Sequence, residues 1–327
     1  MIFFIQAKSQ QVFTISGNVK DAKTGEDLIG AIVTVKELPA RGTASNAYGY
    51  YSLIVPLGRY TIAAQFIGYT SQELLVDVKG ALKINFSLQK TAMELNEVVV
   101  TGQRQDENIT QTQMGLQKLD VKEINNIPVI FGEKDLLKTI QLMPGIKSAG
   151  EGSSGFNVRG GAADQNLILL DEATVYNASH LMGFFSVFNS DAIKDITIYK
   201  GNEPAEYGGR LSSVLDIKTN EGNNKHFGVN GGIGLISSRV SLEGPIVKDK
   251  GSFIISARRT YADMFLKLSK DTNFNTAKLF FYDVNAKANY RINDKNRIFI
   301  SGYFGKDVLG ISSFGGIDHV IDHHPII

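Results

Sequence analysis

Histidines and aspartates near the end of the chain could bind a metal ion. His319 and His323 stand four residues apart, and Asp318, Asp322 and His324 adjoin them. Imidazole and carboxylate groups together can hold a transition metal. An exposed loop or a truncated chain end would give the same local composition without a metal. We therefore predict no metal site, and His319 and His323 are retained only as weak candidates.

A glycine-rich stretch in the middle of the chain formally matches a nucleotide-binding motif. Residues 150–155 follow the pattern G-x-G-x-x-G. This motif binds a dinucleotide only between a strand and a helix, whereas the residues that follow, 156–158, are typical of a strand. We therefore predict no nucleotide and no other cofactor. Gly152, Ser153 and Ser154 are instead candidates for a loop that contacts a ligand.

The composition excludes several other classes of protein. The 327 residues include no Cys, which excludes disulfides and Cys-based zinc or iron–sulfur sites. The 34 Lys and Arg residues balance 33 Asp and Glu residues, so a nucleic-acid partner is not expected. His180 and His226 stand alone in the sequence, and no Ser/His/Asp arrangement is evident. We predict that the protein is not an enzyme.

Residues 1–9 resemble the end of a secretory signal peptide. Residues 1–5 are apolar, and Ala7 and Ser9 are the small residues typical of a cleavage site before Gln10. A basic beginning is missing and the apolar core is short, which indicates a partial signal peptide truncated at its start. The alternative is a frayed apolar first strand of a soluble protein.

Short strands separated by turns are predicted for residues 13–90. Ile15, Gly17 and Val19 alternate with polar residues, and a turn at residues 21–25 follows. Several strands at this spacing, with Gly and Pro in the turns, favour a small antiparallel β-sandwich.

This segment also resembles a carboxypeptidase regulatory-like domain. The matching motifs are GNVKD at 17–21, TGE at 24–26, GAIV at 30–33, GYYSL at 49–53, PLGRY at 56–60 and FIGY at 66–69. The segment contains no His, so it cannot build the zinc site of a peptidase. The resemblance therefore implies a non-catalytic sandwich.

A polar linker, 91–113, leads into a compact mixed domain at 114–222. Apolar residues at helical spacing predict a helix over 135–143, which Pro144 and Gly145 end. Asp171 is expected to close a turn after its strand. Further strands are predicted at 156–158, 167–171, 193–199 and 214–219.

Long alternating strands are predicted for residues 226–327. Every second residue from Tyr282 to Ile292 is apolar, and the residues between them are polar. A short polar turn leads to a second strand of the same kind. Such hairpins build outer-membrane β-barrels, although a large soluble sandwich also alternates. About 100 residues supply only five or six strands, so we predict the start of an antiparallel transmembrane β-barrel that is incomplete.

The motifs of residues 99–219 resemble the plug of a TonB-dependent outer-membrane receptor. They are IP at 127–128, LLKTIQLMPGI at 136–146, FNVRGG at 156–161, LLDEA at 169–173, ITIYKG at 196–201 and PAEYGGR at 204–210. With the preceding sandwich, the chain is similar to receptors of the Bacteroidetes type. The resemblance implies a mainly β protein with a sandwich, an α+β plug and a barrel, and a chain that stops inside the barrel.

The resemblance also implies partners and a location. Receptors of this family take up a scarce nutrient, such as a siderophore, oligosaccharide or peptide, across the outer membrane. The C-terminal domain of TonB, outer-membrane lipid and an extracellular substrate are the expected partners. The sandwich and the TonB box would lie in the periplasm. The motifs of the starch-utilisation subgroup are absent, so no surface lipoprotein partner is indicated. A secreted or surface β-domain adhesin without transport is the alternative.

Two sets of residues take their expected roles from this resemblance. A short β-branched stretch within the polar linker is the candidate TonB box, which would pair with TonB by strand addition. It consists of Glu97, Val98, Val99, Val100 and Thr101. The alternative is that this stretch forms the first internal strand of the plug. Arg159 and Arg210 are expected to pair with carboxylates of the barrel, because a guanidinium suits a carboxylate partner.

Overall fold

The computed structural model divides the chain into two units. The described residues are 11–91, 116–119, 135–150, 153–261, 263–268, 277–293, 295–312 and 318–323. The first unit is Met1–Arg104 and the second is Gln105–Ile327. Each unit has a hydrophobic core of its own.

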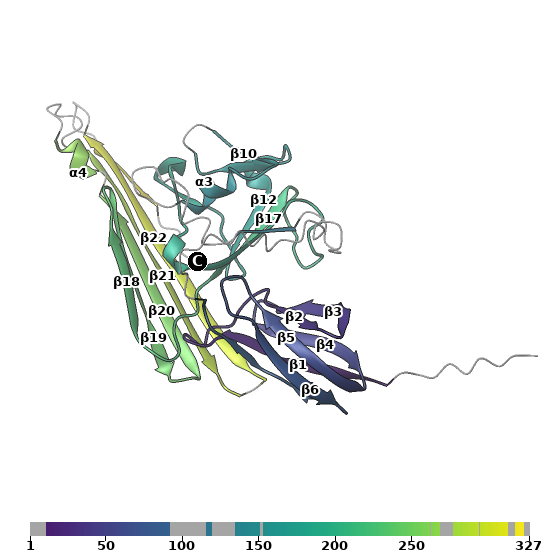
Figure 1. Ribbon diagram of the computed structural model, residues 1–327. Coiled ribbons are helices and arrows are strands. Elements are labelled where there is room, and N and C mark those ends of the chain that lie inside the picture. The colour runs from purple at the N-terminus through teal and green to yellow at the C-terminus, as the bar shows by residue number, and fades with distance from the viewer. Residues whose placement is uncertain are drawn as a thin grey trace, which may run out of the picture. The chain divides into compact units, whose positions relative to one another are not determined.

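The first unit is a β-sandwich of two sheets (Figure 1). One sheet has the order β4-β1-β7, with β8 also paired to β1, and the other has the order β3-β2-β5-β6. The strands are β1 Val12–Asp21, β2 Ile32–Val35, β3 Leu38–Ala44, β4 Tyr50–Pro56, β5 Gly58–Gln65, β6 Gln72–Val78, β7 Leu82–Lys83 and β8 Phe86–Leu88. Alternate residues of β1, including Ile15 and Val19, are buried in a core with Tyr51 and Phe86. The predicted sandwich is confirmed.

The turn after β1 follows directly from its residue types. The carboxylate of Asp21 accepts hydrogen bonds from the backbone N–H groups of Lys23 at 2.7 Å and Thr24 at 3.1 Å. Gly25 has a φ of +74°, a left-handed conformation that glycine adopts without a steric penalty. The turn therefore forms where the sequence predicts it.

The described residues between 116 and 222 form a middle domain built on a five-stranded sheet. Its strands are β9 Leu116–Leu119, β12 Asn166–Leu170, β13 Ala173–Thr174, β16 Ile193–Tyr199 and β17 Ser213–Thr219, in the order β13-β12-β17-β16-β9. Two short ribbons add β10 Ile146–Ser148 with β11 Phe156–Val158, and β14 Ser179–His180 with β15 Phe185–Ser186. The core includes Phe156, Phe188, Ile196 and Ile198, all buried.

Helices are few and short in this unit. The predicted helix over 135–143 is only α3 Leu136–Ile140, and Asp135 caps it by accepting a hydrogen bond from the N–H of Lys138. The chain then turns, because Pro144 lacks the N–H group that a helix needs and Gly145 adopts a left-handed φ of +80°. Among the described residues, the other helices are the single turns η2 Ala163–Gln165, η3 Leu181–Gly183 and η4 Ser190–Ala192, and α4 Asp263–Leu266. None of the helices in the described part of the chain is long and apolar enough to cross a membrane.

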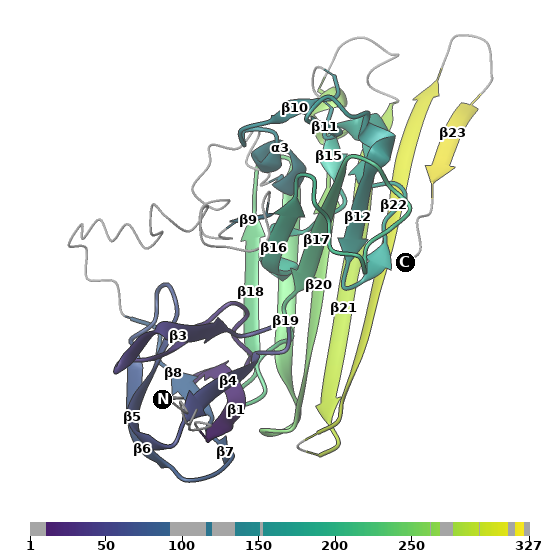
Figure 2. The same ribbon diagram turned by 90° about the vertical axis from the view of Figure 1, so that its right-hand side faces the viewer.

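Six long strands form an antiparallel sheet in which sequence neighbours pair (Figure 2). They are β18 Gly228–Ile233, β19 Ser237–Val247, β20 Gly251–Thr260, β21 Lys278–Arg291, β22 Arg297–Ser312 and β23 Asp318–His323. The six described strands form an open sheet and do not close into a barrel. This architecture matches the predicted start of an incomplete barrel.

The two faces of the six-stranded sheet differ in chemistry. On β21, Asp283, Asn285 and Asn289 are buried, and they point towards the middle domain. On the opposite face, Tyr290 and Ile300 are exposed, the latter by 70%. The alternation predicted from the sequence therefore separates a polar face, covered by the middle domain, from an apolar face that no described residue of the second unit covers.

Candidate functional site: the interface between the middle domain and the six-stranded sheet

Charged side chains from both sides meet in this interface. One group, the His180 cluster, consists of His180, Arg258, Asp283, Tyr303 and Asp307. His180 ends β14 of the middle domain, and the other four lie on β20, β21 and β22 of the sheet. Nδ1 of His180 lies 2.5 Å from Asp307 Oδ1, and Nε2 lies 3.3 Å from Asp283 Oδ2. The hydroxyl of Tyr303 lies 3.0 Å from the same Nε2.

Arg258 joins the His180 cluster to the middle domain a second time. Its Nε and Nη2 groups donate to Asp283 Oδ2 at 2.9 and 2.5 Å, and Nη2 also donates to the carbonyl of Ser186 at 2.8 Å. The ring of Phe281 stacks on His180 at 4.1 Å, and the Arg258 guanidinium lies 4.9 Å from the same ring. The charges of His180, Arg258 and Asp283 are therefore enclosed by protein, while Asp307 keeps a small exposed fraction.

The protonation state of His180 follows from its neighbours. Burial lowers the pKa of the imidazole, but hydrogen bonds to Asp283 and Asp307 and their negative charges outweigh it, so the pKa is raised. With two carboxylates and one arginine, the cluster is electrically balanced only when His180 carries a proton. The sequence gives no local sign of this, because the partners are 103 to 127 residues away (from 180 to 283 and 307).

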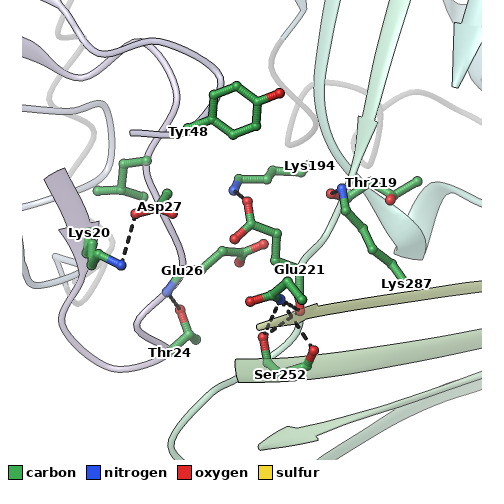
Figure 3. Close-up of polar contacts among 12 residues, drawn as sticks. Lys20, Thr24, Glu26, Asp27, Tyr48, Lys194, Thr219, Glu221, Ser252 and Lys287 are labelled. Carbon is green, nitrogen blue, oxygen red and sulfur yellow. Dashed lines mark hydrogen bonds and ion pairs between the residues drawn. The ribbon is translucent and has the colours of Figure 1, made fainter. Parts of the chain in front are cut away.

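A second group lies where the middle domain continues into the sheet. Glu221 pairs with Lys194 of β16 at 2.8 Å and with Arg297 of β22 at 2.6 Å. Its backbone carbonyl accepts from Ser252 at 2.7 Å and from Asn289 at 3.0 Å. Figure 3 shows the Glu221 and Lys194 side chains directed at each other. This set of five residues is the Glu221 anchor.

Two cations control the charge of Glu221. Burial raises the pKa of its carboxyl, but the charges of Lys194 and Arg297 outweigh burial and hold the pKa well below its usual range. Gly222, with a φ of +79°, follows directly. A Cβ atom at Gly222 would lie 2.2 Å from the carbonyl oxygen of Phe253, so the backbone is pressed against β20.

Two further ion pairs cross the interface. Asp171 contacts Lys287 at 2.7 Å, and Asp191 contacts Arg239 at 2.5 Å. Asp171 has a φ of +48° and also accepts hydrogen bonds from the N–H and the hydroxyl of Thr219. Asp171 thus sits in the turn expected for it and also binds the sheet, a role that its local sequence does not reveal.

A small cavity of about 40 Å³ lies beside the Asp171–Lys287 pair. Its polar lining includes Asp171, Thr219, Asn285 and Lys287, and Tyr303 borders it. The Nδ2 group of Asn285 is buried and has no hydrogen-bond partner among the described residues. A cavity of this size can hold about one to three water molecules.

The residues selected from sequence lie elsewhere. Arg159 and Arg210 are exposed, and neither forms an ion pair with any residue that the structure describes. Their pairing with barrel carboxylates stays a prediction. The interface that is described has mostly the opposite polarity: carboxylates of the middle domain meet cations of the sheet. Alternation could have pointed to those cations, because Lys287, Arg239 and Arg297 all occupy polar-face positions.

The candidate ligand loop is only partly described. Gly152 lies outside the described residues. Ser153 accepts a hydrogen bond from the side-chain amide of Gln141 at 2.9 Å through its carbonyl. Ser154 is fully buried, and its N–H donates to the carbonyl of Gly183 at 2.5 Å. The contact of this loop with a ligand stays a prediction.

The structure does not describe the side chains of the remaining candidates. Residues 97–101, the candidate TonB box, lie outside the described residues. The backbones of His319 and His323 belong to β23, where they pair with Ile311 and Asp307. Among the side chains that the structure describes, no group of three His, Cys, Asp or Glu residues could hold a metal ion.

Comparison with known proteins identifies two domains. Residues 15–100 match the CarboxypepD_reg-like domain, and residues 130–213 match the TonB-dependent receptor plug domain. The chain is 32% identical to carboxypeptidase D of Rattus norvegicus and 31% identical to that of Homo sapiens, each over 94 residues. These matches cover 28% of this chain and 7% of each relative, and they concern the regulatory-like domain only.

Solved outer-membrane proteins are similar over a larger part of the chain. The siderophore receptor PirA from Acinetobacter baumannii is 20% identical, with a TM-score of 0.44, over 60% of this chain and 32% of its own. The transporter YddB from Escherichia coli is 14% identical, with a TM-score of 0.48, over 65% of this chain and 36% of its own. The chain thus spans about a third of these structures. The chain carries a carboxypeptidase regulatory-like domain followed by a TonB-dependent receptor plug domain, and the middle domain is that plug.

Proposed function

We propose that this chain is part of a TonB-dependent outer-membrane receptor that imports a scarce nutrient such as a siderophore, oligosaccharide or peptide. The observation that carries the proposal is the two-sided sheet. Its polar face is fastened to the plug by buried ion pairs, and its opposite face exposes apolar side chains. The exposed side chains are Val240, Leu242, Ile255, Ile298, Ile300 and Phe304. Lipid would cover such a face in an outer-membrane protein.

The proposed partners follow from the plug domain. TonB would pull on a short segment near the plug, and residues 97–101 are our candidate for it. Pairing by strand addition relies on main-chain hydrogen bonds, which a β-branched stretch can form with an added strand. The sandwich and this segment would then lie in the periplasm. The substrate would bind from the outer side, and the transport step would require energy from the inner membrane.

A charged substitution on the apolar face tests the membrane location. We expect Ile300→Arg to reduce the assembly of the protein into outer membranes, because an arginine on a lipid-facing surface is unfavourable, by up to about 2–4 kcal/mol at the bilayer midplane. Leu74→Arg is the matched control, since Leu74 is an exposed leucine of the sandwich. Assembly is measured by membrane fractionation and by heat-modifiable mobility on gels. If the two variants behave alike and the protein is freely soluble, the receptor proposal is wrong and the adhesin alternative gains support.

Transport itself needs a separate measurement. Cells that express the protein are compared with and without TonB, using radiolabelled siderophores, oligosaccharides and peptides. We expect accumulation of one class of compound, which stops when TonB is absent or when residues 97–101 are deleted. Accumulation that persists without TonB would contradict the energy-coupled mechanism.

A further inference from the structure

The His180 cluster holds one turn of the plug against the six-stranded sheet. The turn, Ser179–Ser186, contains three successive residues with positive φ: Leu181 at 48°, Met182 at 57° and Gly183 at 103°. Positive φ is unfavourable for leucine and methionine, so such a turn persists only where its surroundings hold it. The N–H of Leu181 donates to Asp307 Oδ2 at 3.0 Å, on the same carboxylate that contacts His180. The sheet therefore supplies part of what holds the turn.

The far end of the same turn is also fastened by this cluster. The carbonyl of Ser186 accepts from Arg258, whose guanidinium is oriented by Asp283. Ser186 is fully buried, while Met182 at the tip of the turn is 77% exposed. Both ends of the turn are thus held by residues that also surround His180. A change in the charge of His180 acts directly on the groups that hold the turn.

We propose that His180 is a proton-controlled latch, which fastens the turn Ser179–Ser186 to the sheet when its imidazole is charged and loosens it when the imidazole is neutral. The charges of the cluster support this. Arg258 and protonated His180 together balance Asp283 and Asp307. Loss of the imidazole proton leaves one negative charge in excess in a buried site, which is unfavourable unless the site opens to water.

Other charged groups near the turn belong to the plug and do not provide an alternative latch. Asp135 accepts a hydrogen bond from the N–H of Ser186 at 2.8 Å, and the ammonium of Lys138 lies 5.5 Å from the ring of Phe185. Both contacts are within the plug, so they remain when the turn separates from the sheet. Tyr303 is uncharged at neutral pH and can accept a hydrogen bond from charged His180 or donate one to neutral His180.

The direction of the pH effect follows from the raised pKa of His180. A histidine whose pKa is higher in the folded state stabilises that state fully below its unfolded pKa of about 6.5. This contribution is lost as the pH rises through the folded pKa. The latch is therefore closed in mildly acidic solution and loosens at alkaline pH. The inference concerns how the plug is retained and does not depend on which substrate is imported.

The absence of cysteine from the chain permits a direct test. In the full chain, purified in detergent micelles, Ser186→Cys places a thiol at the buried end of the turn and Met182→Cys places one at its exposed tip. The rate of maleimide labelling of the Ser186→Cys variant, divided by that of the Met182→Cys variant, measures how often the turn opens. The division corrects for the pH dependence of thiolate formation, because the exposed thiol reacts without any opening of the turn. We expect this ratio to rise about tenfold between pH 6 and pH 9, which corresponds to about 1.4 kcal/mol in the opening equilibrium of the turn.

Two histidine variants identify the group that titrates. With His180→Gln added, the ratio should be high at pH 6 and should not change with pH. His226→Gln is the matched control, since His226 is exposed and lies outside the cluster, and it should keep the tenfold rise. An equal ratio at pH 6 and pH 9 in the protein with His180 intact would overturn the latch, and this measurement does not require the His180 variant to fold. A tenfold rise that survives His180→Gln would overturn it as well.

Discussion

The Glu221 anchor and the His180 cluster both join the plug to the sheet, but their charges depend differently on pH. At the anchor, a lysine and an arginine enclose a carboxylate, and both cations keep their charge at any ordinary pH. In the His180 cluster, one of the two cations is an imidazole. The cations of the anchor are therefore of types whose ordinary pKa lies well above the neutral range, whereas the cluster depends on a histidine, whose ordinary pKa lies close to that range.

Chain connectivity increases this difference. Glu221 lies only two residues after β17 and seven before β18, so the anchor sits where the plug becomes the sheet. His180 is far from that junction along the sequence. A plug that must rearrange and return needs one attachment that stays and others that open. We infer that the Glu221 anchor is the attachment that stays and the His180 cluster is one that opens.

Removal of Arg258 should have the largest effect of any single substitution in the interface. Arg258→Met leaves the buried carboxylate of Asp283 without its arginine, and breaking a buried pair in this way costs about 3–5 kcal/mol. The free energy of unfolding, measured by urea titration, should fall by that amount. Arg259→Met is the matched control, because Arg259 is the exposed neighbour on the opposite face of β20. Its effect should stay within about 0.5 kcal/mol.

The effect of removing Arg258 cannot be predicted from the sequence, although the two faces of the sheet can. Alternation along Tyr282–Ile292 predicts two faces of different chemistry, and Asp283 and Asn289 lie together on the polar face, which the structure shows to be buried. Alternation is a local property, so neighbouring residues are enough to predict the two faces. The ion-pair partners cannot be predicted in this way, because residues such as Asp171 and Lys287 are 116 residues apart. Their pairing depends on how two separately folded elements dock, which no local pattern records.

The same limit applies to Arg159 and Arg210. The family motif has arginine at both positions, and among the described residues neither has a carboxylate partner. No other histidine lies near His180 in the sequence, so no local pattern indicates a role for it. Its importance comes entirely from Asp283 and Asp307, which reach it through strand register. Sequence motifs identified the plug, and tertiary packing determines which of its residues touch the sheet.

Neutralisation of Glu221 should have an intermediate effect and the opposite pH dependence to the latch. Glu221→Gln removes the charge that balances Lys194 and Arg297, with an expected loss of about 2–3 kcal/mol at pH 7. The variant retains hydrogen-bonding atoms, so the loss is smaller than for Arg258→Met. Because the folded pKa of Glu221 is lowered, its contribution is present above the unfolded value of about 4.3 and is lost as the pH falls through the folded pKa.

The pH profile distinguishes the two attachments. Urea titrations between pH 3 and pH 9 should show the difference between wild type and Glu221→Gln shrinking only on the acidic side. Glu206→Gln, an exposed glutamate of the plug, serves as the control and should not alter the profile. A difference that shrinks between pH 7 and pH 9 would mean that the anchor, too, responds to protons in the neutral range, and the contrast with His180 would disappear.

The smallest effect is expected at Asn285, between the two attachments. Its Nδ2 group is buried and has no partner among the described residues, and the side chain borders the cavity beside Lys287. An unsatisfied buried amide is unfavourable, so an apolar side chain of similar size should be tolerated or preferred. We expect Asn285→Leu to raise the free energy of unfolding by at most about 1 kcal/mol. Val284→Leu, on the apolar face of the same strand, controls for the added bulk of leucine. A loss of more than about 1.5 kcal/mol would mean that water in the cavity binds the amide, and the middle of the interface would then contribute to retention as the two attachments do.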